Sequence, residues 1–433
     1  MDFFMEARPL SGSFWTLAVS CLTVAILVAT LFPRNDPTRR MYPTLNDRRP
    51  FELSDTRVKQ NFVANARKLL REGLEKFQGG PFRILTAHGP TLIFPPSYIQ
   101  ELRNLDNLSH VLAIAQVWRN STFRAAHWLR ITTTYTHHIT KAAMELKAWP
   151  AFMRPLVNRL LPHSRALISL VREAEQVMGS VLKSRQALKA TGQSPEYLDA
   201  IEWFAQVAKG RRYNPVHVQL TLSFVAIHTT ADMLTQVMFD LAQHPEYVDP
   251  LRQEAVRVLG EHGWRKTSLY GLKLMDSVLK EVQRLRPIND TSLQRVALKD
   301  MKLADGTYIP RGTLLAVAST RHWDPEVYPE PETFDGYRFY KLRQEKNKEN
   351  TSQFVSTGQD HLGFGHGEHA CPGRFFASNE IKIMLCHILL KYDWRLVKGE
   401  EPKIVVHGFN LIADPKTRLE IRRRQEELVI DDL

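Results

Sequence analysis

The stretch HLGFGHGEHACPGRFFA, residues 361–377, decides the fold. Its spaced residues form the pattern F-G-x-G-x-x-x-C-x-G, made by Phe364, Gly365, Gly367, Cys371 and Gly373. Glycines let the backbone bend tightly and approach a flat ligand, and the first amides of a helix stabilise a thiolate at its start. The phenyl ring of Phe364 can shield the sulfur from water. We therefore predict a helix from Cys371 to Lys391, with Cys371 as a metal ligand.

Cys371 has two other interpretations. A cysteine at the start of a helix is often just a small buried apolar residue. Alternatively, His366, His369 and Cys371 lie close together in the sequence, with His361 upstream, and could hold a zinc ion. The zinc site would leave the glycines unexplained.

The same stretch resembles the haem-binding loop of the cytochrome P450 family. The resemblance implies haem b with the Cys371 thiolate as axial iron ligand, in a mainly α fold with small peripheral β-sheets. His369 stands where the family usually has an arginine that meets a haem propionate, and Arg295 matches another propionate-binding arginine. The cofactor-binding residues implied in this way are Phe364, Gly365, His369, Arg295 and Gly373.

Two motifs elsewhere support this resemblance. Glu281 and Arg284 stand three residues apart in a helical segment, so they share a face and can pair; a solvated helix pair is the alternative. PETFDGYRF, residues 331–339, resembles the family's P-E-x-F-x-P-x-R-F, with Gly336 where proline is usual. The family then implies a buried structural network of Glu281, Arg284 and Arg338 that supports the haem loop.

The segment VAIHTTAD, residues 225–232, resembles the family's oxygen-activation stretch A-G-x-D/E-T-T. The resemblance implies that Thr229 is the catalytic hydroxyl that bonds dioxygen and delivers protons. His228 replaces the usual acid and becomes the candidate relay residue, while Ala226 replaces the usual glycine. A threonine inside a helix more often bonds the carbonyl one turn back, which is the alternative.

The N-terminal region carries an apolar run, SFWTLAVSCLTVAILVATLF, without a charge from Ser13 to Phe32. At about 1.5 Å per residue, such a helix spans a bilayer. A cleaved signal peptide is the alternative, but no basic segment precedes the run. Arginines follow it closely, so the positive-inside rule predicts a cytoplasmic body. The expected organisation is a lumenal 1–12, a transmembrane anchor 13–32, a non-helical Pro-rich basic linker 33–50 and a haem-thiolate catalytic domain 51–433.

The rest of the body is predicted to be mostly helical. The clearest helix begins at Asn214-Pro215, a cap followed by proline, and stays apolar for about 30 residues, so it should cross the core. Short strands should follow Pro287, separated by the turns Asp305-Gly306 and Arg311-Gly312. The other expected elements are a helix from a Ser54 cap to about Phe77, a hairpin at 81–96, helical structure over most of 97–244 and a helix at 268–286.

The first half is shorter than the resemblance requires. An LSH-like segment at Leu108–His110 is joined almost directly to an HWLRI-like segment at 127–131. The family's W-x-x-x-R, which holds the haem propionates, has no match, because Trp118 is followed four positions on by Thr122 and Trp128 by Thr132. The catalytic domain is therefore expected to be shortened around 108–130, with the loss of one wall of the haem pocket.

Composition limits the partners. The formal charge is +12, but the basic residues are scattered, so we expect no nucleic-acid partner. Only three cysteines are present, and Cys21 lies in the apolar run, which excludes a disulfide framework. No G-x-G-x-x-G follows a strand, so electrons should come from a separate NADPH-cytochrome P450 reductase.

The resemblance implies a monooxygenase of the fungal microsomal type, with a single span in the endoplasmic reticulum membrane and a cytoplasmic catalytic domain. It would use O₂ to hydroxylate or epoxidise a lipophilic secondary metabolite, terpenoid-like or polyketide-like. One alternative is a catalytically impaired haem-binding relic or truncated form. The other is the zinc protein, which colour would distinguish from a haem protein.

Overall fold

The computed structural model describes residues 38–49, 52, 55–86, 89–102, 105, 108–109, 128–147, 149–150, 153–191 and 199–432. The predicted membrane span at 13–32 lies outside them, as does most of the stretch around 108–130. Among the helices that are described, none is both long enough and apolar enough to cross a membrane.

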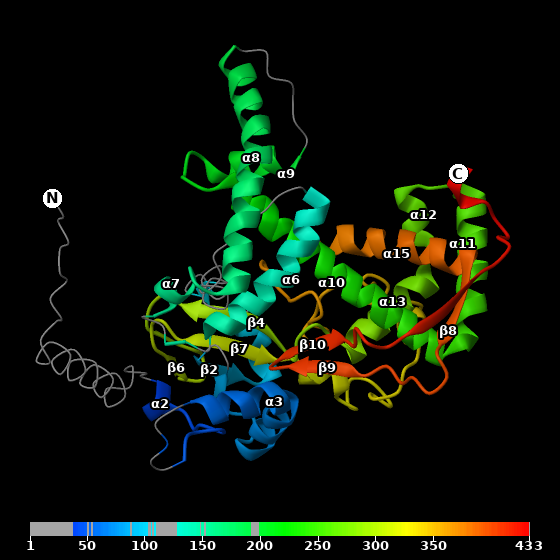
Figure 1. Ribbon diagram of the computed structural model, residues 1–433. Coiled ribbons are helices and arrows are strands. Elements are labelled where there is room, and N and C mark those ends of the chain that lie inside the picture. The colour runs from blue at the N-terminus through cyan, green and yellow to red at the C-terminus, as the bar shows by residue number, and fades with distance from the viewer. Residues whose placement is uncertain are drawn as a thin grey trace, which may run out of the picture.

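A five-stranded sheet forms one side of the body, at the lower left in Figure 1. Its strand order is β1-β2-β7-β4-β3. The predicted hairpin is confirmed, because β1 and β2 pair antiparallel with Ile84 opposite Thr91. β2 continues the sheet by pairing parallel with β7. The strands are β1 (Phe82–Thr86), β2 (Gly89–Phe94), β3 (Leu108–Ser109), β4 (Thr291–Ala297) and β7 (Leu314–Ala318).

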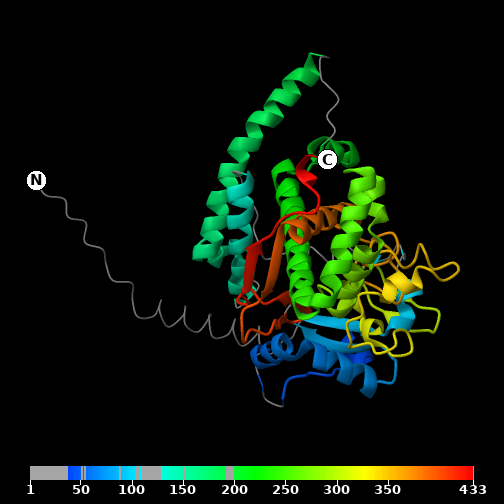
Figure 2. The ribbon, with the colours of Figure 1, turned by 90° about the vertical axis from the view of Figure 1, so that its right-hand side faces the viewer.

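The other side of the body is a group of helices, seen at the right of Figure 1 and again in Figure 2. It consists of α10 (Pro215–Gln243), α11 (Val248–His262), α13 (Lys273–Leu285) and α15 (Arg374–Lys391). Their apolar side chains, such as Val237, Leu259, Val278 and Leu385, form one buried cluster. The structure thus confirms a mainly α body with small sheets.

The long helix α10 begins where the sequence predicts. The side chain of Asn214 accepts hydrogen bonds from the amides of Val216 (2.9 Å) and His217 (3.3 Å), and Pro215 occupies the first turn. Leu220 packs in a cluster with α6 (Trp128–Lys147) and α8 (Pro162–Ala190), whereas Val237 belongs to the large helical cluster. The helix therefore joins two cores.

The remaining elements surround these two layers. α6 and α8 pack together, and Figure 2 shows α8 extending beyond the body. The other helices are α2 (Thr38–Met41), α3 (Thr56–Lys76), α4 (Ile99–Leu102), α7 (Arg154–Val157), α9 (Ala200–Ala208), α12 (Lys266–Gly271) and α14 (Arg338–Leu342), with short 3₁₀ turns η1 (Pro96–Tyr98), η2 (Pro245–Tyr247), η3 (Thr320–Trp323) and η4 (Ile430–Asp432). Three two-stranded sheets pair β5 (Met301–Lys302) with β6 (Tyr308–Ile309), β8 (Tyr392–Leu396) with β11 (Leu419–Arg423) and β9 (Ile404–His407) with β10 (Asn410–Ala413).

Part of the predicted linker differs from expectation. A turn of helix, α2, forms at Thr38–Met41, and the chain then runs beside β1. The amide of Leu45 donates to the carbonyl of Arg83 (3.0 Å), and Asn46 exchanges two hydrogen bonds with the backbone of Leu85. Residues 38–49 therefore pack on the body, and the prediction of a wholly non-helical linker was wrong.

The predicted helix at 268–286 is in fact two helices, α12 and α13. The break falls at Leu272, whose backbone is not helical. The carboxylate of Glu254 in α11 accepts the amides of Leu274 (2.7 Å) and Met275 (2.9 Å), the first amides of α13. A side chain from another helix thus satisfies the new helix start, a cause that local sequence does not reveal.

The predicted start of the last helix at Cys371 was also wrong, because α15 begins at Arg374 with Gly373 as its N-cap residue. Cys371 belongs instead to the preceding loop, since its amide donates to the carbonyl of Phe364 (2.7 Å). Its position before the helix keeps it near the helix N-terminus.

Candidate functional site

The loop that carries Cys371 folds back on itself. Gly365 and Gly367 have φ of +72° and +81°, a conformation that other residues rarely adopt. The amide of Gly365 donates to Leu362 (2.8 Å), and the amide of Ala370 donates to Gly367 (3.0 Å). Together with the bond from Cys371 to Phe364, these bonds present Cys371 at the end of the loop, with partial exposure to solvent.

Two of the residues predicted to bind the cofactor, Phe364 and Gly373, are neighbours of Cys371. Phe364 is partly buried against the large helical cluster and meets Phe354 edge to face, with ring centroids 5.1 Å apart. A Cβ atom on Gly373 would stand 4.0 Å from the Cys371 sulfur, an ordinary van der Waals distance, so Gly373 lies beside the sulfur. His369, by contrast, lies exposed on the loop.

Arg295 lies within the five-stranded sheet, on β4. Its side chain is buried and donates to the carbonyl of Gln294 (2.9 Å). Burial lowers the pKa of Arg295 to about 10, so the guanidinium is still charged at neutral pH.

Thr229 and His228 occupy the middle of α10. The Thr229 hydroxyl donates to the carbonyl of Val225 (2.7 Å), the bond that a helical threonine commonly makes. His228 is exposed, with its ring 5.4 Å from that of Phe224. Leu222 and Val225, which share the helix face of Thr229, are 42% and 50% exposed, so this face presents apolar surface.

Glu281, Arg284 and Arg338 form one buried network. The Arg284 guanidinium makes two hydrogen bonds of 2.8 Å to the Glu281 carboxylate, and both side chains are fully buried. Arg338 Nε donates to the same carboxylate (3.0 Å). The remaining guanidinium protons are taken by backbone carbonyls, including those of Pro329 and Pro331. The three residues therefore lock α13 to the segment that follows β7.

The model of the family described as Cytochrome P450 matches residues 130–421. The chain belongs to the cytochrome P450 family. Relatives named as cytochrome P450 monooxygenases confirm that this is a family of enzymes. The chain is 38% identical to the monooxygenase hepE of Aspergillus oryzae, covering 94% of this chain and 90% of the relative. It is 35% identical to calE of Penicillium decumbens, covering 96% of each.

A third relative, cytochrome P450 monooxygenase 1 of Gibberella fujikuroi, is 49% identical over 313 residues, 71% of each chain. The alignment with hepE is 495 residues long, more than the 433 residues of this chain, so hepE has residues for which this chain has no counterpart.

Solved structures confirm the P450-like fold. The structure titled "Retinoic acid bound cyanobacterial CYP120A1" superposes with a TM-score of 0.60 at 18% identity, covering 88% of this chain and 99% of that one. The structure titled "Crystal structure of a Cytochrome P450 (CYP102L1)" gives 0.59 at the same identity and coverage. At this identity the likeness shows the fold alone.

The zinc alternative for this P450 chain was wrong. His361 is buried, and its Nε2 bonds the side-chain oxygen of Gln283 (3.1 Å). His366 Nδ1 pairs with the Thr357 hydroxyl (3.2 Å). Across the residues that the structure describes, no group of three or more histidine, cysteine, aspartate or glutamate side chains could hold a metal ion.

Three residues beside the P450 loop were not predicted from the sequence. Gln283 lies between Glu281 and Arg284 on α13 and bonds His361. Gly363 passes so close to it that an added Cβ would stand 2.3 Å from Gln283 Cδ. His322, in η3, accepts the amide of Leu362 at Nε2 (2.8 Å). Only Gly363 had a signal, its position beside the glycine pattern.

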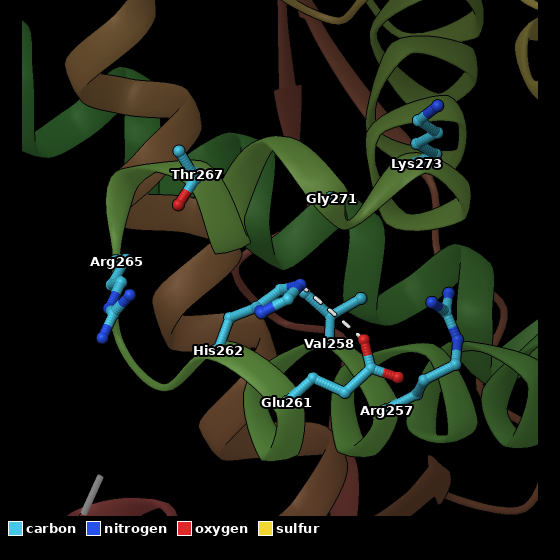
Figure 3. A pocket seen from close by; sticks show the side chains of 8 residues that line it. All are labelled: Arg257, Val258, Glu261, His262, Arg265, Thr267, Gly271 and Lys273. Carbon is cyan, nitrogen blue, oxygen red and sulfur yellow. Dashed lines mark ion pairs between the residues drawn. The ribbon is translucent and has the colours of Figure 1, made fainter.

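Another cleft lies between the end of α11 and the start of α13, and no residue of the P450 loop lines it (Figure 3). Its volume is about 510 Å³, and its basic side chains include Arg257, Arg265 and Lys273. Figure 3 shows that they point in different directions, while His262 faces Glu261 at 3.7 Å. These groups do not converge on one position, so this cleft is not the functional site.

The residues at the loop fit a haem. Cys371 supplies a thiol at the end of a glycine-shaped loop, and the carbonyl of Phe364 holds its amide in place. The apolar face of α10 near Thr229 and the exposed Phe375 and Phe376 of α15 are surfaces that a flat apolar cofactor can cover.

Proposed function

We propose that this chain is a haem-thiolate monooxygenase that hydroxylates or epoxidises a lipophilic secondary metabolite with O₂. One observation carries the proposal: Cys371 stands at the end of a loop shaped by Gly365 and Gly367, next to a buried network centred on Glu281. A cysteine that only filled core space would be buried, as Cys386 is. Partial exposure leaves the Cys371 sulfur free to bind iron.

In this proposal the Cys371 thiolate would hold the iron of haem b. When bound, haem supplies the redox chemistry that activates dioxygen. Phe364 excludes water from the sulfur on the protein side, and Gly373 leaves room beside it. Arg295 and His369 would hold the two propionates in this proposal, each as a hydrogen-bond donor.

Thr229 is the proposed proton-delivering residue. A hydroxyl has one proton and two lone pairs, so Thr229 can donate to the Val225 carbonyl and still accept a proton at Oγ1. Its own proton would then leave the Val225 carbonyl and become available for transfer at Oγ1. His228 is exposed and directly precedes Thr229 on α10. It is the proposed relay between solvent and this hydroxyl.

The proposed partners follow from this chemistry. An NADPH-cytochrome P450 reductase would supply electrons, and a single span at 13–32 would hold the protein in the endoplasmic reticulum membrane with its catalytic domain in the cytoplasm. A membrane position suits a lipophilic substrate, which concentrates in the bilayer. The relatives' names support a fungal monooxygenase but do not indicate a substrate.

The second candidate is a catalytically impaired haem-binding form. It is favoured by the alignment in which hepE has residues without counterparts in this chain, and by the lack of a W-x-x-x-R motif. Loss of a pocket wall would leave substrate poorly held while Cys371 still bound iron.

The test measures NADPH oxidation by the full chain with a fungal reductase in phospholipid vesicles. Hydrogen peroxide release is measured alongside. Neither measurement requires a known substrate. The monooxygenase proposal predicts that NADPH is oxidised faster than with reductase alone, and that Cys371→Ala removes the excess. A protein that binds haem but adds nothing to NADPH oxidation would instead be the impaired form.

A further inference from the structure

We infer that His322 is a positioning residue that ties the start of the Cys371 loop to the buried Glu281-Arg284 pair. Its two functional groups face opposite neighbours. The backbone carbonyl of His322 accepts from Arg284 Nη1 (2.6 Å), and its ring Nε2 accepts from the Leu362 amide (2.8 Å). A single residue therefore connects the charged network to the loop. The inference rests on the proposed function only in taking this loop to be the one that holds haem.

The chemistry of the bond requires a neutral ring. An imidazole can accept at Nε2 only when that nitrogen carries no proton, and an imidazolium cannot accept at all. His322 is fully buried. Burial lowers the pKa of His322 to about 3, and the positive charge of Arg284 acts in the same direction. The ring is thus held in the form that accepts the amide.

The residues around His322 hold the same short segment. Gln283 bonds His361, whose ring stacks on that of His322 with centroids 5.0 Å apart. Arg321 Nε donates to the Asp360 carboxylate (2.5 Å), and the hydroxyl of Tyr328 donates to the Asp360 carbonyl (3.2 Å). Residues 360–362 are each fixed, and His322 fixes the last of them, two residues before Phe364.

The competing explanation is that His322 only fills space in the core. Three substitutions separate the two. His322→Phe keeps a stacking ring but removes the acceptor. His322→Asn places its amide near the position of Nδ1, where it cannot reach Leu362. His322→Gln places a carbonyl near the position of Nε2, so it can accept the amide.

The experiment is hydrogen exchange of the peptide that covers Leu362 to Gly365, measured by mass spectrometry on the full chain. We expect exchange to quicken about tenfold in His322→Phe and His322→Asn, and to stay within about twofold of the wild type in His322→Gln. His387→Phe is the matched control, because His387 also stacks on an aromatic ring, Trp264, but lies on α15 outside the loop.

Equal exchange in all variants, or equally fast exchange in His322→Gln and His322→Phe, would overturn the inference. If His322→Phe fails to fold, the contrast between Asn and Gln decides. The reduced carbon-monoxide spectrum gives a second measure, and the inference predicts a smaller share of the band at about 450 nm in the Asn variant than in the Gln variant. A wild type that shows no such band would defeat the proposed function and leave the exchange test valid.

Discussion

At the level of single residues, Glu281 stands at the centre of the buried charge network. Its carboxylate faces two guanidinium groups, from Arg284 and Arg338, in a fully buried position. A buried ion pair adds little net stability, but removing one partner leaves uncompensated charge in a low-dielectric interior. Loss of the Glu281 carboxylate should therefore be costly.

Glu281→Gln should lower the free energy of unfolding by about 3–5 kcal/mol, because two buried arginines lose their counter-ion. The measurement is the urea midpoint. Glu420→Gln is the matched control, since Glu420 pairs with Arg395 at 2.7 Å but both are well exposed, and its loss should cost less than about 1 kcal/mol. Equal effects of the two substitutions would show that breaking the buried network costs no more stability than breaking an exposed ion pair.

Gly363→Ala should destabilise the protein by about 1–3 kcal/mol, because the new methyl group overlaps the buried side chain of Gln283. Gly358→Ala is the control, since a Cβ on Gly358 meets nothing within 4 Å. Thermal unfolding of the two variants gives the comparison. A Gly363→Ala protein as stable as the wild type would mean that Gln283 moves without cost.

At the level of elements, the start of α10 shows how much one N-cap residue contributes to stability. Asn214→Ala should cost about 1 kcal/mol, because the amides of Val216 and His217 lose their acceptor. Gln243→Ala at the exposed other end of the same helix should change stability by less than about 0.5 kcal/mol. Urea unfolding measures both. An unchanged Asn214→Ala midpoint would contradict the capping role.

The elements that the sequence predicted well are those with local signals. The Asn214-Pro215 cap, the hairpin and the turns at Gly306 and Gly312, both with positive φ, depend on neighbouring residues only. The break at Leu272 and the start of α15 at Arg374 were missed, because both depend on bonds to residues distant in the chain or across a loop. Periodicity cannot report such bonds.

At the level of the whole molecule, buried histidines make stability depend on pH. The pKa of His322 is about 3 in the folded protein and about 6.5 when unfolded, so below about pH 6.5 the unfolded chain binds more protons. Stability from this group is present above that pH and is lost as pH falls. Burial raises the pKa of Asp240 to about 6, so the contribution of Asp240 to stability changes with pH in the opposite direction. The effect of His322 must therefore be measured as a difference between the wild type and a His322 variant.

The wild type should lose about 2 kcal/mol of unfolding free energy relative to His322→Gln between about pH 7.5 and about pH 5, because glutamine does not titrate. Urea unfolding of both proteins at the two pH values gives this difference directly. A difference between the two proteins that stays constant with pH would show that the pKa of His322 is the same in the folded and the unfolded protein, as it would be if solvent reached the ring.

The candidate site was predictable in part. The loop pattern singled out Cys371, and the spacing of Glu281 and Arg284 predicted a pair on one helix face, which the structure contains. His322 gave no signal, because it meets Leu362 across 40 residues and polar contacts of that range leave no period in the sequence. The roles of Thr229, His228, Arg295 and His369 stay predictions.

The most direct test of the central claim is the reduced, carbon-monoxide-bound absorbance spectrum of the purified chain beside Cys371→Ala. If Cys371 holds the iron, we expect a Soret band at about 450 nm, as a thiolate-ligated haem gives, and its loss in the variant. No haem in the wild type, or only a band at about 420 nm, would contradict the assignment of Cys371 as the iron ligand.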